Sequence, residues 1–459
     1  MKEFGALDDV KEFIRENRIN LIDIRYADLQ GKWHHITVPA QPFPCWAFSD
    51  GVAFDSSSVP GFERVERSDL IIKPDLSRWF IDPFCGSKCL CFFSHIYSSD
   101  GCYYEKDPRY VLVRALDFLR SGGIADDYCL LPELEFYIFA STFFESEPTR
   151  SGFDIVTERN GNLKLKGGYE LVPPEDEDFD IRSEITEILS EIGISVKYHH
   201  HEGGQFGQNE LELAFAPAFF TADSILLAKY VIRMSALRRN LVATFMPKPI
   251  YNAPGSGLHL HQYLVKDGKN IFWSSENEFN LSHVALYFMG GLLIHMPSLV
   301  AFTNPTTNSY KRLNPRFESP NKICFGVGNR TATVRIPLYD DNLETKRFEV
   351  RTPDGTINPY LVIASMLMAG LDGIEKKIDP VELGYGPINE YSEKVDELLP
   401  LPSSLDEALK ELEKDNEYLR KGGVFTDNLI DTWINLKMKE VEQVRAFPHP
   451  LEFELYFNL

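Results

Sequence analysis

Four strand-like segments of this chain carry charged side chains two residues apart, and this spacing limits what the chain can fold into. They are Glu133 and Glu135 in LPELEFYIF, Glu210 and Glu212 in QNELELAF, His259 and His261 in GSGLHLHQ, and the triplet Arg347, Glu349 and Arg351 in KRFEVR. Residues i and i+2 of a strand point to the same face. One such pair is typical of a strand with a solvated face. Four in one large domain predict a shared sheet with one face rich in carboxylates, imidazoles and guanidinium groups.

The residue types on these faces favour divalent cations that prefer oxygen ligands. Five of the eleven histidines fall in two windows, His199–His201 and His259–His261. Carboxylates with imidazoles are ligands for Mg²⁺ or Mn²⁺, and neither window contains a thiol. Grouped carboxylates repel one another unless cations neutralise them. Because arginines lie in the same segments, the pattern favours metal-dependent phosphoryl transfer, with an acidic structural protein as the alternative.

Composition excludes several other classes of protein. The 459 residues include 47 Lys+Arg and 68 Asp+Glu, a net charge of −21, so we expect neither nucleic acid nor an anionic membrane as a partner. No GxxxxGK[ST] motif is present, so a nucleotide would not be held by a P-loop. The charged N-terminal segment lacks the apolar core of a signal peptide, and we expect a cytoplasmic location. The apolar stretch 284–302 contains His295 and Pro297, and it predicts a buried helix rather than a membrane span.

Four of the seven cysteines, Cys85, Cys89, Cys91 and Cys102, fall in one short window. Their spacing matches none of the usual paired zinc motifs, and the residues between them alternate as in a strand. Structural thiols in a reducing compartment are therefore favoured over a zinc site.

The order of predicted elements indicates an α+β fold with two domains. Near the N-terminus we expect a helix over 8–17, strands over 21–27 and 34–38, and a loop over 51–62. Asp107 followed by Pro108 predicts a helix start, so we divide the chain into residues 1–106 and 107–459. Further strands are expected at 134–139, 195–199, 210–215, 256–264, 331–336 and 347–351, and helices at 109–119, 181–192, 222–237, 284–293, 359–371, 405–413 and 427–446. This mixture lacks the regular βαβ alternation of a doubly wound sheet.

Motifs along nearly the whole chain resemble glutamine synthetase of the bacterial and archaeal type I group. In order they are FDSSSVPGF, ERSDLIIKPD, PELEFYIF, KGGYELVPP, HHHEGGQFGQNE, PGSGLHLHQ, NPTTNSYKRLNPRFESP, NRTATVRIP, KRFEVRTPDGTINPYL and HPLEFELYF. The resemblance implies a small β-grasp-like N-terminal domain and a catalytic domain with a curved antiparallel sheet flanked by helices. It implies a homo-oligomer, a dodecamer of two six-membered rings with active sites between subunits. The implied reaction joins ammonia to the γ-carboxylate of L-glutamate through γ-glutamyl phosphate, with ATP as substrate and two or more Mg²⁺ or Mn²⁺ ions per site.

The resemblance also implies a role for each matching residue. One metal site would use Glu135, Glu202 and Glu210, and the other Glu133, His259 and Glu349. Glutamate would be held by Arg312 and Arg351, beside Gly255, while the nucleotide and its phosphates would contact His200, Phe215, His261, Arg330, Arg335 and Arg347. The ammonium pocket would contain Tyr169, Glu202 and Glu318 together with Asp55 and Ser58 of the adjacent subunit. Asp55 would deprotonate ammonium, and Glu318 would shield the acyl phosphate from water; with Arg330, these are the expected catalytic residues.

Several positions depart from the family pattern. Pro254, Tyr263 and Arg316 replace smaller or more flexible residues, Ser56 replaces a glycine, and Glu344 stands where some members have lysine. Because relatives that join glutamate to polyamines or other amines also vary in such loops, γ-glutamylamine synthetase is the alternative. The complete set of ammonium-pocket residues favours ammonia. A catalytically inactive relative is disfavoured because every metal and arginine position is present.

Two further residues bear on regulation. The short segment between Glu135 and Glu202 resembles the shorter subgroup, which lacks the insertion of adenylylated members. Tyr391 falls near the adenylylation position, but its surroundings favour an ordinary surface tyrosine. Arg64 matches an arginine linked to feedback inhibition by glutamine, with a surface ion pair as an equal alternative.

Overall fold

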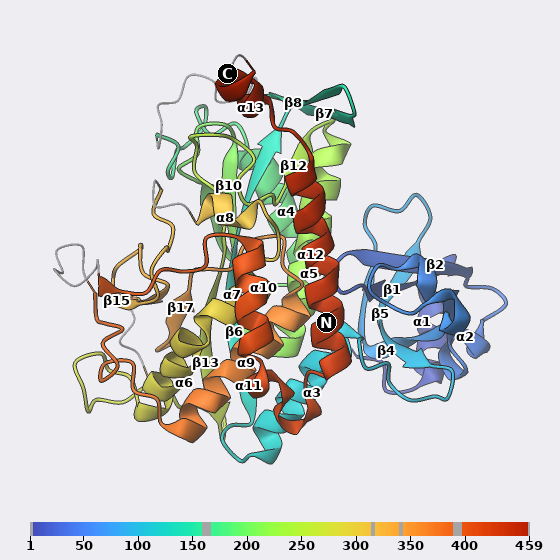
Figure 1. The fold of residues 1–459 in the computed structure, drawn as a ribbon. Coiled ribbons are helices and arrows are strands. Elements are labelled where there is room, and N and C mark those ends of the chain that lie inside the picture. The colour runs from blue at the N-terminus through green and yellow to red at the C-terminus, as the bar shows by residue number, and fades with distance from the viewer. Residues whose placement is uncertain (1–2, 158–166, 314–316, 339–342, 389–396, 458–459) are drawn as a thin grey trace.

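The structure is a computed structural model, and it describes residues 3–157, 167–313, 317–338, 343–388 and 397–457. A small N-terminal domain lies to one side of a much larger mixed α/β domain (Figure 1). This arrangement is the α+β architecture that the sequence predicts.

The N-terminal domain is a five-stranded sheet in the order β2-β1-β5-β4-β3. Its elements are α1 (Leu7–Asn17), β1 (Leu21–Ala27), β2 (Trp33–Pro39), α2 (Cys45–Ser49), β3 (Val52–Asp55), β4 (Asp69–Ile81) and β5 (Cys89–Ser98). The predicted α1, β1 and β2 are confirmed to within one residue. The loop predicted over 51–62 is wrong at its start, because residues 52–55 form β3, which pairs with β4. Polar Asp55 and the serines after it hide this short edge strand from a pattern search.

The large domain is built on a ten-stranded sheet with the main order β15-β16-β17-β13-β6-β10-β9. These strands are β6 (Asp127–Phe139), β9 (Val196–His201), β10 (Gln208–Leu213), β13 (Leu258–Lys266), β15 (Phe325–Val327), β16 (Val334–Ile336) and β17 (Phe348–Val350); β11 (Ala216–Pro217) and β12 (Val242–Thr244) pair with β6, and β14 (Lys269–Asn270) pairs with β13. All pairings are antiparallel except β15 with β16. A separate hairpin, β7 (Ser141–Glu147) and β8 (Arg150–Val156), was not predicted.

Helices pack around this sheet and around one another (Figure 1). They are α3 (Pro108–Ser121), α4 (Phe179–Glu191), α5 (Ala218–Arg238), α6 (His283–Ile294), α7 (Met296–Thr303), α8 (Ser309–Arg312), α9 (Pro359–Lys376), α10 (Leu405–Lys414), α11 (Glu417–Arg420), α12 (Asp427–Ala446) and α13 (Pro450–Tyr456). α5 packs against β6, and α9 is buried along most of its length between α3, α5 and α6. Asn358 caps α9 by accepting hydrogen bonds from two backbone N–H groups, which fixes where the central helix begins.

The helix predicted over 284–293 is confirmed as α6, and the rest of the apolar stretch 284–302 forms a second helix, α7, which meets α6 at 78°. Pro297 begins α7, because a proline is tolerated in the first turn of a helix but not in its interior. Gly290 and Gly291 let α6 approach its neighbours closely, since a Cβ at Gly291 would lie 2.1 Å from the carbonyl oxygen of Ala369 on α9. Among the described residues, no single helix has the length and apolarity of a membrane span, and both halves of this bent pair are largely buried.

A buried ionic network joins the two domains. Asp223 of α5 accepts a hydrogen bond from Arg78 of β4 (2.7 Å), from Arg109 of α3 (3.0 Å) and from the hydroxyl of Tyr360 on α9 (2.6 Å). Burial alone would raise the pKa of Asp223, but Arg109 and Arg78 lower it. The carboxylate therefore stays ionised and holds β4 of the N-terminal domain against three helices of the large domain.

Candidate active site

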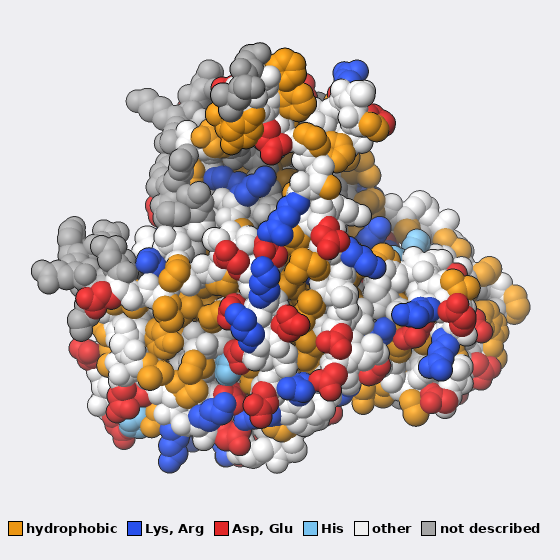
Figure 2. Space-filling view, in the orientation of Figure 1, with side chains coloured by type: hydrophobic (Ala, Val, Ile, Leu, Met, Phe, Trp, Pro, Cys, Tyr) orange, Lys and Arg blue, Asp and Glu red, His pale blue; other side chains and the backbone are white. Residues whose placement is uncertain are grey.

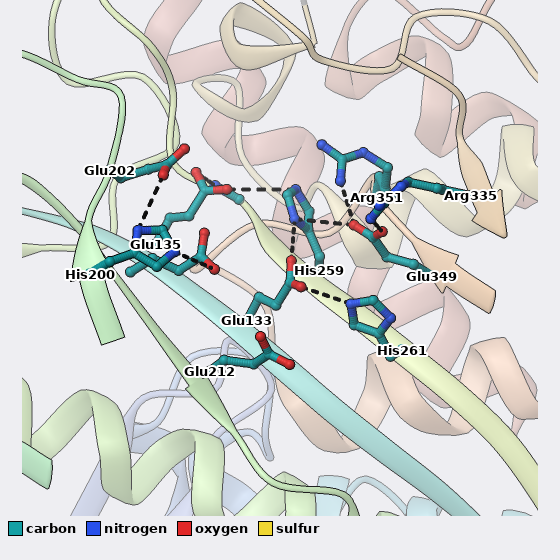
Figure 3. Close-up of polar contacts among 12 residues, drawn as sticks. Glu133, Glu135, His200, Glu202, Glu212, His259, His261, Arg335, Glu349 and Arg351 are labelled. Carbon is teal, nitrogen blue, oxygen red and sulfur yellow. Dashed lines mark hydrogen bonds and ion pairs between the residues drawn. The ribbon is translucent and has the colours of Figure 1, made fainter. Parts of the chain in front are cut away.

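The register of five neighbouring strands brings the predicted charged residues onto one face of the sheet. Opposite residues are Glu210 with His200, Glu210 with Glu135, Glu212 with Glu133, Glu133 with His259, and His261 with Glu349. Directly opposed residues of antiparallel strands point to the same side. Figure 3 shows that their side chains converge over β6, β10, β13 and β17. The shared face predicted from the i and i+2 spacing is confirmed.

The first half of this face, the Glu133–Glu349 cluster, consists of Glu133, His259, His261, Arg335, Glu349 and Arg351. His259 Nδ1 lies 2.9 Å from Glu133 Oε2, and His261 Nε2 lies 2.8 Å from Glu133 Oε1. Arg335 donates to Glu349 at 2.8 Å, and Arg351 donates to its other oxygen. Burial alone would raise the pKa of Glu349, but Arg351 and the two imidazoles lower it to about 2. Protein cations therefore already neutralise much of this cluster.

The second half, the Glu202–Glu210 cluster, consists of Glu135, His200, Glu202 and Glu210, and no arginine is hydrogen-bonded to these carboxylates among the described residues. Burial and the charge of Glu135 raise the pKa of Glu202 to about 7, against the effect of His200. Burial also raises the pKa of Glu210 well above its usual range, and the nearby carboxylates add to the increase. Although burial alone would lower it, the pKa of His200 rises to about 9 because His200 bonds Glu210.

Glu135 lies between the two clusters. Its Oε2 accepts hydrogen bonds from the backbone N–H of Gly257 (2.8 Å) and from Gln208 Nε2 (3.3 Å), while its Oε1 lies 3.7 Å from His259 Nε2. One of its oxygens is thus fixed by the protein and the other faces His259 (Figure 3).

The donor atoms of both clusters fit divalent cations. Three groups have donor atoms within 4.8 Å of one another: Glu133, His261 and Glu349; His200, Glu202 and Glu210; and Glu133, Glu210 and Glu212. Glu202 Oε2 is buried without a hydrogen-bond partner within the described part of the chain. A buried carboxylate oxygen in that state, beside raised carboxyl pKa values, is what a site lacking its cation presents. No cysteine belongs to these groups, so the zinc alternative at Cys85–Cys102 gains no support.

Two buried arginines border the face on the side of β17. Arg312 donates to the carbonyl oxygens of Thr352 (2.8 Å) and Arg351 (3.1 Å), and among the described residues it has no carboxylate in an ion pair. A Cβ at Gly255 would lie 2.6 Å from the Pro247 carbonyl oxygen and 2.8 Å from Arg312. The structure therefore places Gly255, Arg312 and Arg351 together, as the resemblance implies, and allows no larger residue at 255.

An aromatic and guanidinium corner lies at the other end of β13. Arg347 donates to His261 Nδ1 at 3.1 Å, and its guanidinium lies 5.4 Å from the centre of the Phe215 ring. Tyr263 packs against Phe215 with ring centroids 4.9 Å apart. The larger side chain at Tyr263 thus occupies space beside Phe215, which is where the resemblance implies adenine.

Arg330, Tyr169 and Glu318 differ in how closely they approach the carboxylates. Tyr169 packs edge-on to His200 at 5.3 Å and is 51% exposed. Burial raises the pKa of both Glu202 and Tyr169, and the exposed Arg330 lies close enough to offset part of each increase. Glu318 is exposed and follows residues 314–316, which are outside the described part of the chain. Arg316, one of the departures, belongs to that segment.

Asp55 and Ser58 lie at the end of β3, in the N-terminal domain. Asp55 accepts hydrogen bonds from Ser57 and, at 2.9 Å, from the hydroxyl of Ser58. These bonds lower the pKa of Asp55, so its exposed carboxyl is ionised. The contacts of Asp55 and Ser58 within the described residues are confined to their own loop and strand, and their domain lies to one side of the catalytic sheet (Figure 1). A single chain therefore does not bring them to the carboxylates.

Two residues of the face were not assigned a role from the sequence. Glu212 pairs with Lys197 at 2.7 Å and lies beside Glu133 (Figure 3). Gln208 bonds Glu135 and the Gly255 carbonyl oxygen, which links the two sides of the site. The i and i+2 spacing of Glu210 and Glu212 could have identified Glu212. No feature of the sequence pattern distinguished Gln208 from an ordinary polar residue of a strand.

The remaining sequence expectations have mixed outcomes. Tyr391 lies outside the described residues. Arg64 is exposed and takes part in none of the ion pairs of the described residues, so the surface ion pair proposed for it is absent there. Pro254 accepts a hydrogen bond from the hydroxyl of Tyr137 through its carbonyl oxygen at 2.7 Å, which anchors the loop despite the lost N–H. Exposed Glu344 accepts a hydrogen bond from Asn270 through its own carbonyl oxygen.

Comparisons with known proteins agree with this architecture. The family model described as "Glutamine synthetase, catalytic domain" matches residues 105–456, and "Glutamine synthetase, beta-Grasp domain" matches residues 18–99. A glutamine synthetase from Frankia alni is 43% identical, covering 99% of this chain and all of the relative, and one from Aquifex aeolicus is 40% identical over 98% and 99%.

Solved structures extend the comparison to three dimensions. A cryo-EM structure of Plasmodium falciparum glutamine synthetase matches with a TM-score of 0.91 and 28% identity over 99% of both chains. A structure titled "Apo GmaS without ligand" matches with a TM-score of 0.84 and 29% identity over 99% of this chain and all of that one. From the matched domains, the full-length relatives and the carboxylate-lined sheet, we conclude that this chain belongs to the glutamine synthetase family.

Proposed function

We propose that this chain catalyses the ATP-dependent ligation of ammonia to the γ-carboxylate of L-glutamate, through γ-glutamyl phosphate, to give L-glutamine, ADP and phosphate. The observation that carries the proposal is the convergence of two carboxylate–imidazole clusters beside buried arginines on one sheet face. We also propose that the chain divides into two domains, residues 1–106 and 107–459.

Two divalent cations, Mg²⁺ or Mn²⁺, fit the donor atoms of this face. Glu135, Glu202 and Glu210 would hold one, and Glu133, His259 and Glu349 the other. Within 4.8 Å, the donor atoms of Glu202 and Glu210 are grouped with His200, and those of Glu133 and Glu349 with His261. When bound, such cations bring phosphate oxygens and carboxylates together and offset the negative charge that develops during phosphoryl transfer. The raised pKa values of Glu202 and Glu210 support a cation at the first position most strongly.

Arginines on both sides of the cations would orient the substrates. Arg312, with no carboxylate in an ion pair among the described residues, has the charge to bind a carboxylate of glutamate, and Arg351 lies next to it. Arg335 and Arg347 reach the face from β16 and the start of β17, where they would contact phosphate oxygens. Exposed Arg330, near Glu202, would stabilise charge on the phosphoryl group being transferred. Phe215 and His261 complete the nucleotide side.

The ammonium pocket would combine residues of two subunits. Tyr169, Glu202 and Glu318 belong to the catalytic domain, and an adjacent subunit would supply Asp55 and Ser58. The ionised and exposed state of Asp55 supports this role, because a carboxylate at the surface can accept a proton from ammonium bound in another subunit. Glu318 would then screen the acyl phosphate from water.

A homo-oligomer, which we propose to be a dodecamer of two six-membered rings, is supported by apolar side chains at one end of the molecule (Figure 2). α13 and the β7–β8 hairpin lie there (Figure 1), with Phe457 73% exposed and Phe144 80% exposed. Exposed apolar groups at this density are typical of surfaces that subunits cover.

An assay of amine choice tests the proposed function. Phosphate release from ATP and glutamate is measured with ammonium, methylamine, ethanolamine and putrescine in parallel. We expect ammonium to give the highest kcat/KM. Turnover that is best with another amine and negligible with ammonium would overturn the proposal in favour of a γ-glutamylamine synthetase.

Asp55→Ala tests the role given to the adjacent subunit. We expect kcat/KM for ammonium to fall by roughly 10²-fold, the contribution of a general base, with ATP binding unchanged. Asp69→Ala is the matched control, because Asp69 is exposed and pairs directly with Asp55 across β3 and β4. Equal ammonium kinetics in the two variants would contradict the assigned role.

A further inference from the structure

Three thiols gather at the junction of β4 and β5, far from the residues used above. Cys85 lies in the turn between the strands, and Cys89 and Cys91 lie on β5. The sulfur atoms of Cys89 and Cys91 are 3.8 Å apart, and Cys85 lines the same cavity as Cys89. All three are free thiols.

Two of these thiols open into a cavity of about 330 Å³ between the domains. Cys85 and Cys89 line it together with Arg25 and Asp82 of the N-terminal domain and Tyr230 of α5. Cys91 does not line the cavity and is fully buried against Asp23. A small polar reagent therefore has a route to Cys89 even though only 2% of this residue is exposed.

The surroundings shift the pKa values of the two cavity thiols in opposite directions. The hydrogen bond with Cys91 lowers the pKa of the Cys89 thiol, and Arg25 acts in the same direction. Burial raises the pKa of the Cys85 thiol to about 12, and the carboxylate of Asp82 adds to this increase. Arg25 Nη1 is buried without a hydrogen-bond partner in the described structure, so an N–H of the guanidinium remains available for a negative charge. Such a pair combines one thiol that reacts as a thiolate with a second thiol beside it.

We propose that Cys85 and Cys89 are an oxidation site that hydroperoxides convert to a disulfide and that dithiols reduce again. The Cys89 sulfur attacks the terminal oxygen of hydrogen peroxide, the O–O bond breaks, and Cys89 sulfenic acid and one water are formed. The Cys85 sulfur then attacks the Cys89 sulfur, the S–OH bond breaks, and a second water leaves. Overall, two thiols and one hydrogen peroxide give one disulfide and two waters.

Geometry favours this pair over Cys89 with Cys91. Alternate residues of one strand have Cα atoms roughly 6.6 Å apart, near the upper limit for a disulfide. Both of those residues are also fixed by the β5 ladder with β1 and β4. Cys85 is exposed and lies in the turn, where the backbone can adjust to the bond without breaking a strand.

The test uses the full chain, first reduced with a dithiol and freed of it, and then treated with a slight excess of hydrogen peroxide. We expect the intact mass to fall by two hydrogen atoms and to return after dithiothreitol. Trypsin cleaves after Lys88, so the bond joins the peptide ending at Lys88 to the one beginning at Cys89. Because the second peptide also holds Cys91 and Cys102, variants identify the partner of Cys85.

Cys85→Ser and Cys89→Ser should abolish the linked peptides, whereas Cys91→Ser and Cys102→Ser should keep them. Cys85→Ser changes an exposed turn residue, so its result remains usable if the buried variant fails to fold. Gain of oxygen without loss of hydrogen, or a link that survives Cys89→Ser, would overturn the proposal.

Discussion

The two carboxylate clusters on the sheet face are both largely buried, yet the protein treats their charge in opposite ways. In the Glu133–Glu349 cluster, Arg335 and Arg351 bond the two oxygens of Glu349, and Arg351 with the imidazoles of His261 and His259 holds its pKa at about 2. In the Glu202–Glu210 cluster, His200 pairs with the carboxylates and Arg330 also acts on Glu202, yet burial and the charge of Glu135 raise the pKa of Glu202 to about 7.

The charge of the Glu133–Glu349 cluster is thus partly balanced by the chain's own cations, whereas the Glu202–Glu210 cluster depends more strongly on an added cation for its neutralisation. The first half forms with the fold and contributes to its stability. In the Glu202–Glu210 cluster the carboxylates repel one another, and a divalent cation would relieve this repulsion. Cation binding is therefore coupled to the loss of a proton from Glu202. Four predictions follow the same contrast, beginning with the largest effect.

Glu349→Gln should destabilise the protein by about 3–5 kcal/mol, because two buried arginines lose the charge that they bind. We expect ligase activity to vanish with it. Chemical denaturation without metal measures the effect, and Glu442→Gln on the exposed side of α12 is the control. A loss below about 1 kcal/mol would mean that this cluster is not neutralised as described.

Glu210→Gln should act on stability in the opposite direction. It removes one of several repelling carboxylates and keeps a hydrogen-bonding group for His200, so metal-free stability should be unchanged or higher by up to about 1 kcal/mol. Activity should still fall by at least ~10²-fold, because a cation ligand is lost. A destabilisation as large as that of Glu349→Gln would remove the contrast between the clusters.

The pH dependence of cation binding should show the raised pKa of Glu202. Below pH 7 the carboxyl is protonated and a cation must displace the proton, so Mg²⁺ affinity should weaken about tenfold per pH unit from pH 7 to pH 5. Without metal, the folded state binds more protons than the unfolded chain between the ordinary pKa and pH 7, so this group makes the fold less stable as pH rises. Calorimetric titration at several pH values measures the affinity, and a flat profile would contradict the assigned pKa.

Lys197→Met should have the smallest effect. Lys197 pairs with Glu212 at 2.7 Å but is 40% exposed, so its loss should change stability by less than about 1 kcal/mol. Thermal unfolding with and without Mg²⁺ checks this. We expect bound Mg²⁺ to remove most of the difference in stability between the variant and the unchanged protein. A large loss of stability would contradict this expectation and would mean that the charge of Lys197 is essential to the fold.

The residues of the site were predicted from the sequence more completely than the fold was. The i and i+2 spacing of Glu133 with Glu135 and of His259 with His261 fixed which side chains share a face, because strand geometry alone determines this. It could not give the strand order, which places β13 between β6 and β17 and so sets His259 opposite Glu133. Strand order depends on long-range pairing that no local pattern encodes.

Local patterns also failed where polar residues or backbone geometry decide the structure. Strand β3 was missed because Asp55 and its serines are typical of a loop. Helix α7 was not predicted, although the helix predicted over 284–293 matches α6, because both helices are apolar all round and their joint sequence is typical of one buried helix. The different charge states of Glu202 and Glu349 depend on which arginines reach them, and this required the packed structure.

The most direct test of the two-cluster site is anomalous diffraction from crystals of the chain grown with Mn²⁺ and ADP. We expect one manganese peak bounded by Glu202 and Glu210, and a second bounded by Glu133 and Glu349. Absence of both peaks, with manganese bound only at surface carboxylates, would contradict the account.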